Sequence, residues 1–199
     1  MADPIANAGI VATAFDLVEQ RPPSSLTDDS EEAALANRMW PRAIEGLLEV
    51  TDWSFARGIR TLQEADAEAS DIATDADLPH LYTIHPAILK GWRVLDWGVA
   101  WRRDGLFLRA DLGGGLTVRA TLRLTNESQT PQSFQLAVAA RLAVLMAPSL
   151  STSLSKRQQL ISDAKGALED ALAADGRQGS EERYDGLEEQ GDWVTEAIR

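Results

Sequence analysis

The stretch "LTVRATLRLTNESQTPQSFQLAVAARLAVLMAP", residues 116–148, decides the fold because a strand pattern passes directly into a helix pattern. Over residues 116–125 apolar and polar side chains alternate strictly, which predicts a strand with one buried and one solvent-facing side. Thr130 and Pro131 are typical of a helix start, and Pro148 predicts its end. Apolar residues lie around nearly the whole circumference between them, so we expect this helix to be central and buried.

Turn residues upstream of this strand indicate an antiparallel β meander. Asp104-Gly105 and Gly113-Gly114-Gly115 separate short apolar segments, each in the position of a hairpin turn. A strand follows the glycine run, and no Lys-Ser/Thr does, so a phosphate-binding loop is disfavoured. We therefore expect a β insertion over residues 82–126 with one buried and one wet face.

Helical patterns flank this insertion. The expected helices cover residues 3–20, 29–53, 131–147 and 153–175. Asp29 with Glu32 predicts a capping box, Pro41 predicts a kink or break, and Gly176 predicts the last helix end. The predicted fold class is α+β: a mainly α-helical bundle with an inserted antiparallel β meander and an extended C-terminal tail. One domain would span residues 1–176, and the tail residues 177–199.

Composition limits the possible functions. The chain has 199 residues, no cysteine and a formal net charge of −12. Disulfides and thiolate metal sites are therefore excluded, and the acidic charge argues against a protein that grips DNA through basic side chains. A protein past which DNA slides is not excluded. No apolar run is long enough to span a membrane, and the first residues lack the pattern of a secretory signal.

Few residues could carry catalysis. His80 and His85 are the only imidazoles, and their spacing matches no metal motif, so both are interpreted as loop histidines. No Gly-x-Ser-x-Gly elbow is present. A glycosidase-like pair of carboxylates stays open as an alternative, because the chain is rich in Asp and Glu. We expect no enzyme, no cofactor and no metal.

Arginines concentrate in the sheet region of this acidic chain. They are Arg102, Arg103, Arg109, Arg119 and Arg123. Either they form a solvated strand face, or they bind an acidic surface of an identical subunit. Under the second reading, Arg109, Arg119 and Arg123 are the candidate subunit-interface residues.

Three segments together resemble the head-to-tail adaptor proteins of tailed bacteriophages, related to the tail tubular protein A and podophage connector families. They are "PPSSLTDDSEEAALANRMWPRAIEGLLEVTDWSFA", "LPHLYTIHPAILKGWRVL" and "VRATLRLTNESQTPQSFQLAVAARLAVLMAPSLSTS". The resemblance runs from about Ile5 to about Asp175, with Trp40 where the family often has Tyr.

This resemblance implies a structural role without catalysis. The chain would form a homo-oligomeric ring of about twelve copies beneath the portal protein. A stopper, nozzle or tail protein would lie below, and DNA would pass through the lumen without sequence-specific binding. The location would be the virion neck, after assembly in the bacterial host cytoplasm, with no membrane contact. A small phage hydrolase with paired carboxylates and an isolated regulatory binding module are the alternatives.

The tail, residues 177–199, is acidic but carries scattered apolar groups. Its candidate portal-binding residues are Tyr184, Leu187, Trp193, Val194 and Ile198. Fully extended, the tail could reach on the order of 75 Å. Because these groups are too sparse to bury one another, we expect them to fill pockets on the portal, with Trp193 as anchor.

Overall fold

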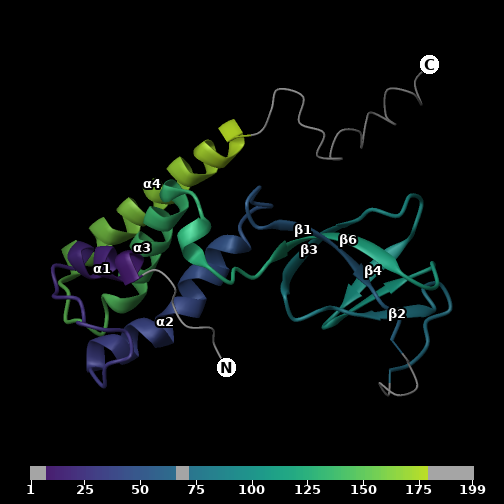
Figure 1. Cartoon of the computed structure of the whole chain (residues 1–199), viewed down its shortest axis with the longest axis horizontal. Coiled ribbons are helices and arrows are strands. Elements are labelled where there is room, and N and C mark those ends of the chain that lie inside the picture. The colour runs from purple at the N-terminus through teal and green to yellow at the C-terminus, as the bar shows by residue number, and fades with distance from the viewer. Residues whose placement is uncertain (1–7, 66–71, 179–199) are drawn as a thin grey trace.

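The protein consists of a helical lobe and a β lobe that lie side by side (Figure 1). The computed structural model describes residues 8–65 and 72–178. The described residues form four α-helices and six strands, and each lobe has a hydrophobic core of its own. The expected mainly helical bundle is therefore wrong: the strands form a second lobe that encloses its own core rather than a meander attached to a bundle.

The helical lobe is built around one buried helix. It comprises α1 (Ala8–Leu17), α2 (Glu31–Leu48), α3 (Gln132–Met146) and α4 (Leu154–Gln178). α3 contacts each of the other three helices, and Phe134, Val138, Leu142 and Met146 are fully buried on it. The apolar circumference read from the sequence thus identified the central helix correctly.

The structure corrects several expected helix details: α2 ends at Leu48 rather than at residue 53, and of the kink or break expected at Pro41 the break does not occur. Ser30, not Asp29, is the N-cap of α2, and its Oγ accepts a hydrogen bond from the Ala33 amide at 3.2 Å. α2 continues through Pro41 without a break. Trp40 and Ile44 on either side are buried, so tertiary packing compensates for the backbone hydrogen bond that proline cannot make. α4 likewise continues past Gly176 to Gln178.

The β lobe contains two three-stranded antiparallel sheets. In the first, β6 (Leu116–Leu122) lies between β1 (Arg57–Leu62) and β3 (Ile88–Val94). In the second, β5 (Phe107–Ala110) lies between β2 (His80–Thr83) and β4 (Trp101–Asp104). Their shared core includes Leu62, Tyr82, Leu108, Leu116 and Val118.

This topology confirms one expected turn and corrects the other. Asp104-Gly105 joins β4 to β5, and Gly105 has the positive φ of 63° that such a turn requires. The glycine run 113–115 instead connects the two sheets, since β5 and β6 do not pair. A Cβ on Gly113 would lie 2.9 Å from His80 Cε1, so close packing requires glycine there. β1 also precedes the expected insertion at residue 82.

The expected wet face of β6 is buried at its centre. Arg119 is 5% exposed and Thr121 is 0% exposed, although both belong to the polar side of the alternation. Asp52, from the link after α2, lies against this face and binds the Arg119 guanidinium. The alternation correctly identified the strand but could not show that a distant segment covers its second face.

Candidate functional site

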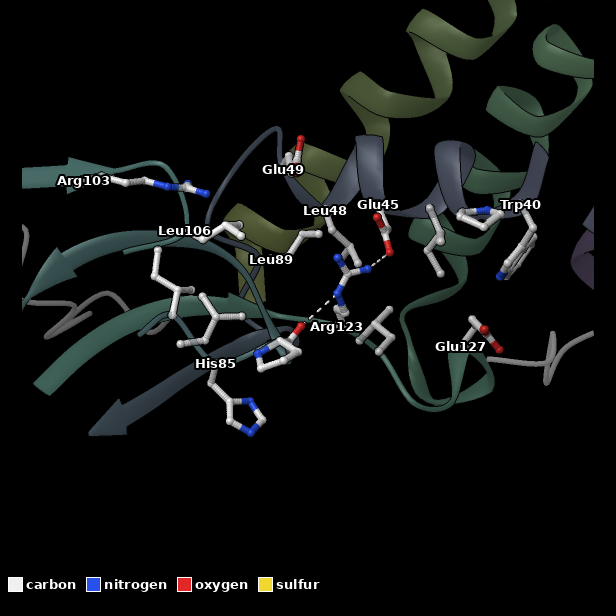
Figure 2. A pocket seen from close by; sticks show the side chains of 16 residues that line it. Trp40, Glu45, Leu48, Glu49, His85, Leu89, Arg103, Leu106, Arg123 and Glu127 are labelled. Carbon is white, nitrogen blue, oxygen red and sulfur yellow. Dashed lines mark hydrogen bonds and ion pairs between the residues drawn. The ribbon is translucent and has the colours of Figure 1, made fainter. Parts of the chain in front are cut away.

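A groove lies between the two lobes. It has a volume of about 550 Å³ and lies between α2 and the β lobe (Figure 2). We call it the interlobe groove. Its apolar lining consists of Trp40, Pro41, Ile44, Leu48, Ile84, Pro86, Ile88, Leu89, Leu106 and Leu124. The rest of the lining is polar or charged and consists of Glu45, Glu49, His85, Arg103, Arg123 and Glu127. A groove of this mixed character could bind an apolar side chain together with polar groups of a partner.

Arg123 crosses this groove. Its guanidinium forms an ion pair with Glu45 of α2, and its Nε donates to the Pro86 carbonyl at 3.0 Å. Figure 2 shows the Arg123 side chain reaching toward Glu45 from the β-lobe side. The Arg123 side chain remains 46% exposed, so it ties the two lobes together while its remaining surface stays accessible to a partner.

The other two candidate interface arginines point into the chain. Arg109 is 4% exposed, and its Nε donates to Asp104 Oδ2 at 3.0 Å. Arg119 is buried as well, and its Nε donates to Asp52 Oδ2 at 2.7 Å. Both guanidiniums therefore bind carboxylates of their own chain. Of the three predicted residues, Arg123 is the one with substantial exposed surface.

The second sheet exposes two arginines, Arg103 and Arg102, of which Arg102 binds carboxylates. Its guanidinium bridges Asp75 at 2.7 Å and Asp104 at 2.8 Å. Arg102 is the main cause that lowers the pKa of the Asp104 carboxyl, and the neighbouring Arg109 lowers this pKa further. Four of the five arginines of the sheet region thus bind carboxylates of the chain, whereas Arg103 donates to the Gly105 carbonyl.

Large apolar side chains are exposed on the β lobe. Trp97 is 98% exposed, Leu106 76% and Ile59 59%. The exposure of Trp97 is not evident from the apolar segments around it in the sequence. Gly98, with a φ of 76°, follows it directly, so the turn residue after this tryptophan was the available signal. Exposed apolar groups of this size commonly mark surfaces that bind other proteins.

Both histidines have structural partners. His80 Nδ1 lies 2.7 Å from Glu64 Oε1, and Glu64 Oε2 accepts from the Gly114 amide at 2.9 Å. The Gly114 amide first, and the His80 ring second, lower the pKa of the Glu64 carboxyl. The Ala87 amide donates to His85 Nδ1 at 3.1 Å. Within residues 8–65 and 72–178, no group of three or more His, Asp or Glu could hold a metal ion.

The predicted portal-binding residues lie outside the described residues. They are Tyr184, Leu187, Trp193, Val194 and Ile198. Over the part of the chain that the structure describes, no helix is long and apolar enough to cross a membrane. No protein-family model matches this sequence, and no curated protein does either.

Proposed function

We propose that this chain is a structural head-to-tail adaptor of a tailed phage or phage-like particle, which forms a ring under the portal. The observation that carries the proposal is the set of large apolar side chains, Trp97, Leu106 and Ile59, exposed outside a completed β-lobe core. The order of the sequence motifs, which resembles the adaptor family, supports the same role.

Ring assembly would bury exposed apolar side chains of every subunit. Transfer of one such side chain from water into an interface stabilises it by about 2–3 kcal/mol. A closed ring repeats every contact around its axis, so weak individual contacts add up to a durable assembly. The β lobe is suited to this role because its exposed apolar groups are not needed for its own core.

The charge of the chain suits a passage for DNA. The formal net charge is −12, so an inner surface of such a ring would repel phosphates rather than retain them. DNA would then move through the lumen without sequence-specific contacts. The portal above and a stopper, nozzle or tail protein below are the partners that this role requires.

Assembly tests the proposal directly. The double variant Trp97→Glu/Leu106→Glu should remain folded, because both side chains are largely exposed, but lose ring formation. A charge inserted into an apolar contact leaves that charge desolvated and unpaired, which we expect to weaken assembly at least about tenfold. Native mass measurement of the chain, alone and with the portal, gives the readout.

The control is Leu154→Glu, which places one glutamate at a residue that is 77% exposed on the helical lobe. We expect this variant to assemble normally. Rings of the double variant that are as stable as those of the unchanged chain would contradict the proposal, as would a chain that never assembles with a portal.

If the chain were instead a hydrolase, we would expect its catalytic carboxylates in the interlobe groove. Glu45 and Glu49 both line it and are the carboxylates best placed for such chemistry. Glu45, however, is bound to Arg123, which holds it in an ion pair across the groove. We expect no turnover of peptidoglycan or soluble glycans by the purified chain. Robust turnover that Glu45→Gln or Glu49→Gln abolishes would establish the hydrolase instead.

A further inference from the structure

A second groove lies on the helical lobe, between α2, α3 and α4. We call it the helical groove. It has a volume of about 330 Å³, and its apolar lining includes Val50, Val144, Ile161 and Leu168. Val50 is 46% exposed and Ile161 57% exposed, so this apolar surface is uncovered in the folded chain.

A glycine keeps the helical groove open. Gly46 lies inside α2, where glycine destabilises a helix relative to alanine. A Cβ built on Gly46 meets no atom within 4 Å, and its φ lies outside the positive range that favours glycine. Neither packing nor backbone conformation within the chain therefore requires glycine at this position. The missing side chain leaves room for an occupant.

Basic side chains lie at the rim of this groove. Arg141 of α3 and Lys165 of α4 both line it and are exposed. Lys165 Nζ is 3.8 Å from Glu169 Oε1, a loose pair between two exposed side chains that contributes little. An apolar groove with two cations at its rim, on a protein of net charge −12, fits an acidic segment with apolar anchors.

We propose that the helical groove binds the acidic C-terminal segment, residues 188–199, of a second copy of this chain. That segment, "EEQGDWVTEAIR", places Trp193, Val194 and Ile198 among four carboxylates. Trp193 fills the space above Gly46, and the carboxylates lie near Arg141 and Lys165. This inference rests on the proposed ring and replaces the portal with a neighbouring copy as the receptor of the tail.

The reach of the chain favours a second copy. α4 extends about 15 Å beyond Leu168, away from the groove, before it ends at Gln178. From Gln178, the chain up to Trp193 could span about 50 Å when extended. A tail that occupied its own groove would have to turn back along α4, whereas a neighbouring subunit can be reached without reversal. The contact is heterologous, so it closes a ring when repeated.

Photo-crosslinking of the full chain tests this contact. Isotope-labelled and unlabelled copies, each with p-benzoylphenylalanine at position 193, are mixed and assembled with the portal before illumination. We expect crosslinks that join a labelled to an unlabelled copy, from position 193 to the groove segments 46–50, 141–144 and 161–168. Gly46→Leu, whose Cβ meets no atom within 4 Å, places a side chain in the groove and should reduce these crosslinks by about tenfold or more. Leu154→Glu, on α4 outside the groove, should leave them unchanged.

The outcomes separate this inference from the proposed function. Rings that form normally but carry crosslinks only within one copy, or only to the portal, overturn the tail contact and leave the adaptor role standing. Crosslinks that persist at full yield in Gly46→Leu also overturn it, since that variant should fold at least as well as the unchanged chain. A chain that forms no ring, and no crosslink between copies, contradicts both proposals.

Discussion

Asp52→Ala should lower the free energy of unfolding by about 3–5 kcal/mol, because it leaves a buried guanidinium without its carboxylate. The Asp52 Oδ2 atom accepts from Arg119 Nε at 2.7 Å and from Arg57 Nε at 3.1 Å. The Arg119 side chain is 6% exposed, so water cannot replace the lost partner. Urea denaturation of the monomeric chain, followed by circular dichroism, measures the loss.

Two further variants test whether the buried charge of Arg119 causes the loss of unfolding free energy in Asp52→Ala. Adding Arg119→Met to Asp52→Ala should recover much of the loss, since the orphaned charge is then removed. Asp75→Ala breaks the exposed pair with Arg102, whose side chain is 53% exposed, and should cost no more than about 1 kcal/mol. Equal losses for Asp52→Ala and Asp75→Ala would contradict the view that burial determines the effect.

Trp53→Ala should also cost about 3–5 kcal/mol of unfolding free energy, as is typical for a large aromatic residue in a core. Trp53 is 0% exposed, and its ring packs against Phe134 at a centroid distance of 5.1 Å. Its Nε1 donates to the Leu47 carbonyl at 2.8 Å. Trp53→Phe keeps most of the packing but loses this hydrogen bond, so an intermediate loss is expected.

Trp97→Ala is the matched control, because the same side chain is removed from a site that is 98% exposed. It should change the unfolding free energy by less than about 0.5 kcal/mol. Thermal or urea denaturation of Trp53→Ala, Trp53→Phe and Trp97→Ala ranks the three variants by their loss of unfolding free energy. Similar losses for Trp53→Ala and Trp97→Ala would show that the core does not depend on Trp53.

Asp52 and Trp53 are neighbours in the link that joins the helical lobe to the β lobe. Asp52 binds Arg119 in the β lobe, while Trp53 packs in the helical core. The next residue, Ser54, donates its amide to Asp175 Oδ1 of α4 at 3.2 Å. Three consecutive residues thus attach the β lobe, α3 and α4 to one another. If the chain assembles as proposed, a weakened link would also be expected to impair assembly, because it would misplace the β lobe relative to the helical groove.

Only part of the candidate site was predictable from the sequence. The alternation over residues 116–125 places Arg119 and Arg123 on one face and does not show that only Arg123 is exposed, and the ion pair of Arg123 with Glu45 joins elements that lie far apart in the chain. Trp97 looked like a core residue because an aromatic between apolar segments usually is one. Its exposure depends on a turn at Gly98. The helical groove at Gly46 forms only where three helices pack together, so the sequence of a single helix does not indicate it.

The sequence by itself determined the local elements. Continuous apolar coverage identified α3 as the central helix, strict alternation identified β6, and Asp104-Gly105 identified the β4–β5 turn. Each of these signals arises from neighbouring residues, whose spacing reflects the period of a helix, a strand or a turn.

Only the tertiary structure decided which elements meet. It paired β6 with β1 and β3 rather than with β5, buried Arg119 beneath Asp52, and carried α2 through Pro41. These outcomes depend on contacts between residues far apart in the chain, such as Asp52 and Arg119. The free energy of such contacts overrides local preference, because burial of a charge or an apolar surface is worth more than the propensity of a single residue.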